Sequence, residues 1–142
     1  MAYELNSLLG RLVDYRLHAV HFVEDYVELH LEARLADESP VLRHDDRPVL
    51  SCYVLPNVTV SGQEFSPADL GWADALRRLI PQDVMATFEE TGIGIRVDFA
   101  NGGIRLNPTE DELVGPEIAM LSGFEDHSWM VWRPGEDAFE DL

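Results

Sequence analysis

Ile93-Gly-Ile-Arg-Val-Asp-Phe-Ala-Asn-Gly-Gly-Ile-Arg-Leu106 is the stretch of sequence that decides the fold. Its first seven residues alternate apolar side chains with Gly94, Arg96 and Asp98, the pattern of a strand with one buried face. The Asn-Gly-Gly that follows favours the positive φ angles of a tight hairpin turn. The apolar run after it predicts the returning strand of an antiparallel hairpin.

The first half of the chain repeats this pattern. Val27 to Leu35 alternates in the same way, and Val49 to Leu55 is a further apolar run. The alignment begins with Leu9–Val13 opposite Leu76–Ile80. It continues with Leu17, Ala19 and Phe22 opposite Val84, Ala86 and Phe88 after a one-residue slip, and with Val27, Leu29 and Leu31 opposite Ile93, Ile95 and Val97. This self-similarity predicts two copies of a helix followed by three strands.

Helix signals are clearest at the start of the second copy. Ser66-Pro67-Ala68-Asp69 combines a capping hydroxyl, a proline suited to the first turn and an acid three residues after the cap. Trp72, Leu76, Leu79 and Ile80 then form one apolar stripe down to Pro81. A helix is therefore predicted to begin at Ser66, and its counterpart is predicted around Leu9.

The predicted fold class is α+β, a mostly antiparallel, curved sheet with two helices. Pseudo-repeats of a helix plus three strands span about 3–62 and 66–107, and the segment 108–142 adds one extra C-terminal strand. The 142 residues are predicted to form a single domain, 1–142. The copies differ most in the connection over 36–48, which is either a solvated loop or a functional insertion.

The charge of the chain excludes whole classes of partner. Asp and Glu number 27 against 10 arginines and no lysine, which gives a formal net charge of -17. Such a surface repels DNA, RNA and anionic membranes. Residues 107–142 carry ten of the acids and the single base Arg133, so the excess is concentrated there.

The single cysteine and the absence of a leader indicate the compartment. Cys52 has no partner for an intrachain disulfide. Residues 1–20 contain Glu4 and Asp14 and lack a continuous apolar core, so we expect no secretory signal. The longest uncharged stretch, 48–63, is interrupted by Pro56 and is too short to span a bilayer. A cytoplasmic protein is expected.

Motifs for catalysis are missing from the sequence. It holds no Gly-x-Ser-x-Gly elbow and no phosphate loop with its lysine. Cys52 lies within the apolar run Val49–Leu55, and a buried thiol is inert. No catalytic, cofactor-binding or metal-ligating residue and no cofactor are therefore predicted, and the chain is expected not to be an enzyme.

The histidines leave one alternative open. His18 and His21 are three residues apart on a predicted strand, which would place them on opposite faces. His30 would lie near His21 and Glu28 if the turn at Glu24-Asp25 closes a hairpin, although this spacing is not diagnostic of zinc. A small metal-dependent enzyme that uses His21, His30 or His44 with neighbouring acids is thus a lesser hypothesis.

The segment Ser128-Trp-Met-Val-Trp-Arg133 predicts a strand with apolar side chains on both faces. Such a strand is either central in the sheet or covered by a partner. Core packing is the simpler interpretation. The alternative is a tryptophan anchor flanked by acids, as aromatic residues commonly anchor protein interfaces.

Several segments resemble a group of small uncharacterised acidic bacterial proteins. The resemblance rests on Leu9-Gly10, Phe22–Leu29, Gly115–Ala119 and Trp129–Trp132, and it spans nearly the whole chain. Some proteins of this kind look like immunity proteins, the inhibitors encoded beside polymorphic toxins. The resemblance implies inhibition of a toxin and identifies no functional residue.

The leading functional prediction is a non-enzymatic acidic protein that neutralises a basic protein partner, most concretely an immunity protein against a nuclease-like toxin. A toxin that holds nucleic acid exposes basic residues, and a strongly negative inhibitor is steered to them. The candidate partner-binding residues are Asp45, Asp46, Glu110, Asp111, Glu112, Glu125, Asp126 and Trp132. The alternative is a scaffold or housekeeping domain that forms a homodimer through its tryptophan strand.

Overall fold

A computed structural model of the chain describes residues 8–33, 46–90, 94–113, 115 and 117–133. These residues form two antiparallel sheets of five strands each. Sheet A has the order β1 (Arg16–Val23), β2 (Tyr26–Glu32), β3 (Val49–Cys52), β9 (Ala119–Ser122) and β10 (Met130–Trp132). Sheet B has the order β5 (Gln63–Phe65), β4 (Asn57–Val60), β8 (Gly102–Leu106), β7 (Gly94–Phe99) and β6 (Val84–Glu90).

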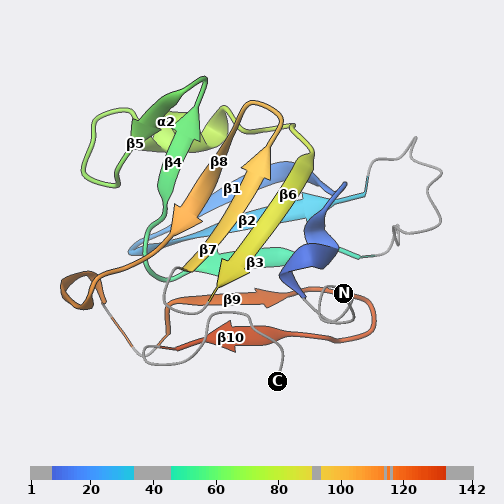
Figure 1. The fold of residues 1–142 in the computed structure, drawn as a ribbon. Coiled ribbons are helices and arrows are strands. Elements are labelled where there is room, and N and C mark those ends of the chain that lie inside the picture. The colour runs from blue at the N-terminus through green and yellow to red at the C-terminus, as the bar shows by residue number, and fades with distance from the viewer. Residues whose placement is uncertain (1–7, 34–45, 91–93, 114, 116, 134–142) are drawn as a thin grey trace.

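The two sheets are stacked, and their strands cross (Figure 1). One core lies between them, and both sheets contribute fully buried side chains to it, such as Leu29 and Leu50 from sheet A and Ile95 and Ile104 from sheet B. In the described part of the chain, no helix combines the length and the apolar character needed to cross a membrane.

The predicted α+β fold with two helices is wrong, because the described chain is mostly β. Its one α-helix is α2 (Trp72–Arg77), and two 3-10 turns, η1 (Leu9–Leu12) and η2 (Glu110–Glu112), complete the helical elements. The N–H of Ser66 does bond to the Asp69 carboxylate at 2.8 Å. However, Gly71 has a φ of 93°, and this left-handed residue ends the turn before α2 begins.

The predicted first helix fails for a related reason. The turn η1 is only four residues long, and Asp14, just beyond it, has a φ of 78°. A left-handed residue at this position redirects the chain into β1 after a single turn. Hydrophobic residues at helical spacing therefore line the core here without a regular helix.

Strand order shows an internal repeat larger than the predicted unit. Strands β1, β2 and β3 form a meander in sheet A, after which β4 and β5 complete sheet B. Strands β6, β7 and β8 form the matching meander in sheet B, after which β9 and β10 complete sheet A. Each half is thus a helical turn followed by five strands. The prediction of one extra C-terminal strand is wrong, because the C-terminal segment contributes two strands, β9 and β10, which belong to the second repeat.

Matching irregularities fix the alignment of the halves. The register of β1 with β2 shifts between Leu17 and Ala19, and that of β6 with β7 shifts between Val84 and Ala86. Leu17 pairs with Leu31 and Val84 pairs with Phe99, so Leu31 corresponds to Phe99. The alignment of Leu31 with Val97 was therefore off by two residues. Alternating patterns match equally well at any shift of two, because the side-chain period of a strand is two.

Candidate functional site

Three side chains of metal-ligating types meet on the outer face of the β1–β2 hairpin. His21 comes from β1, and Glu28 and His30 come from β2. His21 lies directly opposite Glu28 in the antiparallel register, and His30 follows Glu28 by two residues, on the same face. One possible ligand atom from each of the three residues lies within 4.8 Å of the others.

Glu28 is the centre of this group. Its Oε1 lies 3.0 Å from His30 Nε2 and 3.7 Å from His21 Nδ1. An ionised carboxylate only accepts hydrogen bonds, so the proton in the contact with His30 belongs to the histidine. The two imidazole rings pack against each other with centroids 3.9 Å apart.

A β-bulge determines which histidines share this face. The register runs from Leu17 opposite Leu31 to Ala19 opposite His30, so His18 is an extra residue in β1. The expectation that His18 and His21 lie on opposite faces is wrong, since the bulge interrupts the alternation. The His18 ring lies 6.4 Å from that of His30, edge to face.

The equivalent positions of the other half carry different chemistry. There, Phe88 of β6 lies opposite Arg96 of β7, and Asp98 follows Arg96 by two residues. Arg96 Nε is 3.1 Å from Asp98 Oδ1, and the Arg96 guanidinium lies 4.0 Å from the centroid of the Phe88 ring. The same three positions therefore form an ion pair with an aromatic cover on sheet B.

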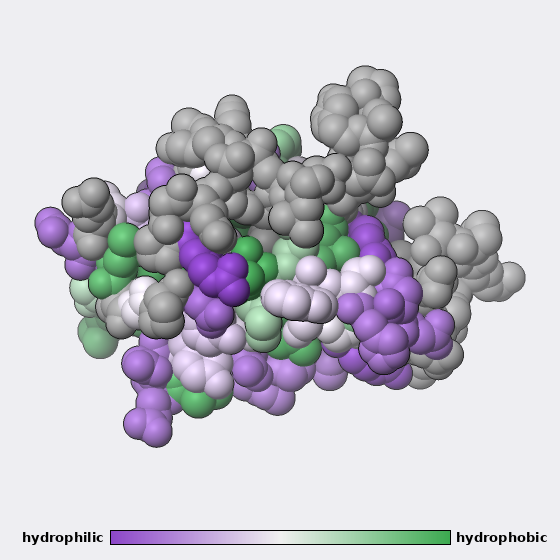
Figure 2. Space-filling model, turned by 90° about the horizontal axis from the view of Figure 1, so that it is seen from below, coloured by the Kyte–Doolittle hydropathy of each residue, from purple (hydrophilic) through white to green (hydrophobic). Residues whose placement is uncertain are grey.

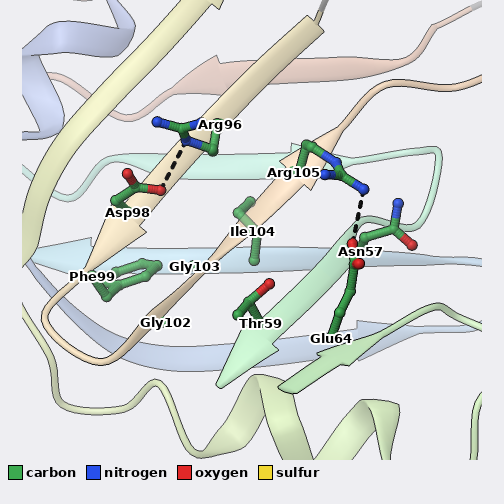
Figure 3. A pocket seen from close by; sticks show the side chains of 10 residues that line it. All are labelled: Asn57, Thr59, Glu64, Arg96, Asp98, Phe99, Gly102, Gly103, Ile104 and Arg105. Atoms are coloured by element: carbon green, nitrogen blue, oxygen red, sulfur yellow. Dashed lines mark hydrogen bonds and ion pairs between the residues drawn. The ribbon is translucent and has the colours of Figure 1, made fainter. Parts of the chain in front are cut away.

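Sheet B also carries a hollow of about 410 Å³ on its outer face. Figure 3 shows Arg96 beside Asp98 and Arg105 beside Glu64, with Gly102 and Gly103 along strand β8 between them. Arg105 Nη2 is 2.8 Å from Glu64 Oε2. Two arginines and two acids balance in charge, so this hollow lacks the excess positive charge that would hold an anionic ligand.

Asp46, one of the acids proposed to contact a partner, is a core residue and is 1% exposed. Its Oδ2 accepts the hydroxyl of Tyr15 at 2.7 Å, and its Oδ1 accepts the N–H of Glu125 at 2.6 Å. The carboxylate thus ties Tyr15, the residue before β1, and the β9–β10 connection to the chain that enters β3. A partner does not reach this group in the folded protein.

The remaining acids do not form one face. Glu125 and Asp126 lie in the connection between β9 and β10, whereas Asp111 and Glu112 belong to η2. Figure 1 shows these two segments at opposite ends of β9. All four side chains are exposed, but Asp126 Oδ2 lies 3.3 Å from Arg11 Nη1 and Glu112 Oε1 accepts the N–H of Thr109 at 2.8 Å.

The tryptophan strand β10 lies at an edge of sheet A. Trp132, the proposed anchor, is only 8% exposed, whereas Trp129 is 58% exposed. Trp129 precedes β10 and follows Asp126 by three residues. On the face seen in Figure 2, which views the molecule from below, apolar residues reach the surface next to strongly hydrophilic ones. Trp129 is therefore the tryptophan that a partner could contact.

Sequence reasoning missed Trp129 as the exposed tryptophan because a single alternating strand does not show which of its faces is buried. Three candidate positions lie outside what the structure describes: Asp45, His44 and the side chain of Glu110.

Cys52, the remaining candidate nucleophile, is not accessible to solvent. Cys52 is fully buried in β3, and burial raises the pKa of its thiol to about 12. A thiol in this state is neither a nucleophile nor a metal ligand at neutral pH.

Comparisons with protein families, with curated proteins and with solved structures find no match for this chain.

Proposed function

We propose that the chain is a non-enzymatic acidic protein that binds and neutralises a basic protein partner, in the most concrete form an immunity protein against a nuclease-like toxin. The observation that carries this proposal is that many of the arginines are paired with acids of the same chain. Five of them form ion pairs with acids of the same chain: Arg11, Arg16, Arg77, Arg96 and Arg105. Each pair cancels one arginine against one acid, so these five arginines form no basic patch, and the excess of acids, 27 against 10, sets the external field.

Such a field favours a basic partner for two reasons. It accelerates the encounter with a surface that carries the opposite charge, and it repels nucleic acid that competes for that surface. Exposed Trp129 follows the exposed acids Glu125 and Asp126 by four and three residues, so the same connection offers an aromatic contact and two acids. We propose this connection as the primary contact, in place of the larger set of acids along 107–142.

A cytoplasmic location is part of the proposal. Cys52 is free and is held away from solvent, which suits a compartment in which thiols stay reduced. An immunity protein acts where its toxin would otherwise harm the producing cell.

The test begins with the gene next to this one. If that gene encodes a protein with a basic C-terminal domain, the purified domain is assayed for nuclease activity with and without an equimolar amount of this chain. We expect inhibition at one-to-one stoichiometry. Raising the ionic strength from about 0.01 M to about 0.15 M shortens the screening length from about 30 Å to about 8 Å, so the association rate should fall strongly.

Charge reversal locates the contact. Glu125→Lys should weaken binding more than Asp74→Lys, a change of equal charge in α2, which Figure 1 places far from the β9–β10 connection. If the two variants weaken binding equally, the β9–β10 connection is not the contact site, and only the general electrostatic attraction remains supported. Affinity that changes with neither salt nor charge reversal would overturn the electrostatic proposal. A concentration-dependent dimer in sedimentation with no basic partner would favour the self-associating scaffold.

A further inference from the structure

We propose that His21, Glu28 and His30 form a binding site for a divalent transition metal of the zinc class on the outer face of the β1–β2 hairpin. This inference is independent of the proposed toxin partner. It rests on three side chains that the antiparallel register brings together from residues as far as nine positions apart in the sequence.

The types of ligand fit this class of metal. Two imidazoles and one carboxylate are a known zinc ligand set, and imidazole also suits copper and nickel. Ca²⁺ and Mg²⁺ take oxygen ligands, so two histidines out of three disfavour both. The net charge of -17 adds a field that attracts any cation.

The geometry requires only small adjustments. Bonds of about 2.0–2.2 Å at tetrahedral angles place neighbouring ligand atoms about 3.3 Å apart. The separations from Glu28 Oε1 are 3.0 Å to His30 Nε2 and 3.7 Å to His21 Nδ1, which bracket that value. The ligand atoms of His21 and His30 lie within 4.8 Å of each other, so the side chain of His21, the most exposed of the three, has to rotate to bring the three atoms around one ion.

The site is open to solvent on one side. The side chain of His21 is 54% exposed, while those of Glu28 and His30 are 25% and 24% exposed. Two ligands are therefore held by packing and one is free to adapt. Three protein ligands leave a fourth position for water, or for His18, whose ring lies 6.4 Å from that of His30.

The other half of the repeat shows that the fold does not demand this triplet. The corresponding positions hold Phe88, Arg96 and Asp98, which contact one another on the outer face of sheet B. Packing alone therefore does not explain two histidines around a glutamate. The competing interpretation is a plain hydrogen bond between Glu28 and His30 within β2, with the His21 ring packed against His30 from β1. The two interpretations differ in their response to metal.

The experiment uses the full chain after treatment with a chelator. Zn²⁺ is titrated in competition with a chromophoric chelator, and the melting temperature is followed with and without one equivalent of Zn²⁺. We expect one Zn²⁺ per chain and a higher melting temperature, because a ligand that binds only the native state stabilises it. Loss of even an outer partner of a metal ligand costs about 10–100-fold, so His30→Gln or His21→Gln should weaken binding at least that much.

Two further variants complete the test. His127→Asn, which removes an exposed histidine whose φ of 65° suits asparagine, should leave both readouts unchanged. His18→Gln distinguishes a fourth protein ligand, which weakens binding when lost, from water, which leaves it unchanged; either result is compatible with the three-residue site. The proposal is overturned if Zn²⁺ leaves the melting temperature unchanged, or if His21→Gln and His30→Gln bind Zn²⁺ as tightly as the wild type.

Discussion

Arg16 and Asp83 face each other in an antiparallel bridge that joins the start of β1 to the start of β6. Two backbone hydrogen bonds flank it, from the Leu17 N–H to the Gln82 carbonyl at 3.0 Å and from the Val84 N–H to the Tyr15 carbonyl at 2.8 Å. Arg16 and Asp83 occupy equivalent positions in the two halves, and the two hydrogen bonds exchange when the halves are exchanged. An approximate two-fold axis therefore passes through this bridge.

The helical elements follow the same symmetry. The turn η1 of the first half packs against β6 of the second, and α2 of the second half contacts β1 of the first. Each sheet also takes its last two strands from the opposite half. The core is consequently shared, and its cohesion depends on contacts between the halves.

Removal of the Asp46 carboxylate should destabilise the fold. Asp46→Ala deletes the acceptor for the Tyr15 hydroxyl and the Glu125 N–H, and we expect the free energy of unfolding to fall by about 2–4 kcal/mol in urea. Asp46→Asn keeps one oxygen and should cost less. Asp74→Ala, at an exposed site, should change stability by no more than about 0.5 kcal/mol. A loss at Asp46 as small as that control would contradict the buried network.

Cys52 should be unreactive in the native protein. Burial raises its pKa to about 12, so near pH 8 the thiolate fraction is roughly 10⁻⁴, and the thiolate is the form that attacks a disulfide reagent. Labelling with such a reagent should be slow in buffer and should reach one thiol per chain in urea. Rapid stoichiometric labelling in buffer would show that β3 opens readily.

Asp126 should titrate below the usual range of an aspartate. Its pKa is lowered chiefly by the Ser128 N–H, which donates to Oδ1 at 3.0 Å, and further by Arg11. Since the folded pKa is the lower one, the stabilising effect is present above the unfolded value of about 3.9 and is lost as pH falls through the folded value. Arg11→Gln should raise the pKa of Asp126 in an NMR titration of its carboxyl carbon. Arg77→Gln should not.

Two glycines with similar backbone angles should respond very differently to alanine. Gly62 and Gly123 have φ values of 82° and 93°, so alanine costs each about 1–2 kcal/mol of backbone strain. A Cβ at Gly62 meets nothing within 4 Å, whereas one at Gly123 would lie 2.2 Å from the Arg47 carbonyl oxygen. Gly123→Ala should therefore lower the unfolding free energy by at least about 1 kcal/mol more than Gly62→Ala. Equal losses would mean that the backbone near Arg47 yields easily.

Alternating hydrophobicity located the long strands β2 and β7 and missed β4, β5 and β9. The patterns around Val27–Leu31 and Ile95–Phe99 coincide with β2 and β7, and the turn at Asn101 connects β7 to β8. Strands β4, β5 and β9 have only three or four residues each. They are too short to show a period, and β4 and β9 are placed by pairing with β8 and β3 of the opposite half.

The candidate sites depended on features that no local pattern encodes. The bulge at His18 is set by its pairing with β2, so the common face of His18, His21 and His30 appears only in the folded hairpin. Asp46 is distant in sequence from Tyr15 and Glu125, and its acidic neighbours suggested a solvated surface. Composition described the charge of the chain correctly and left open which acids reach solvent.

The exchange of β4–β5 and β9–β10 between the sheets means that the chain resembles two subunits joined by a peptide bond. Cleavage in the connection between β5 and α2 would yield two fragments, each with three strands of one sheet and two of the other. Neither fragment would close a hydrophobic core alone, and the two would recover the fold only by complementation, as an obligate heterodimer. The linker would then serve to fix their stoichiometry and raise their effective concentration.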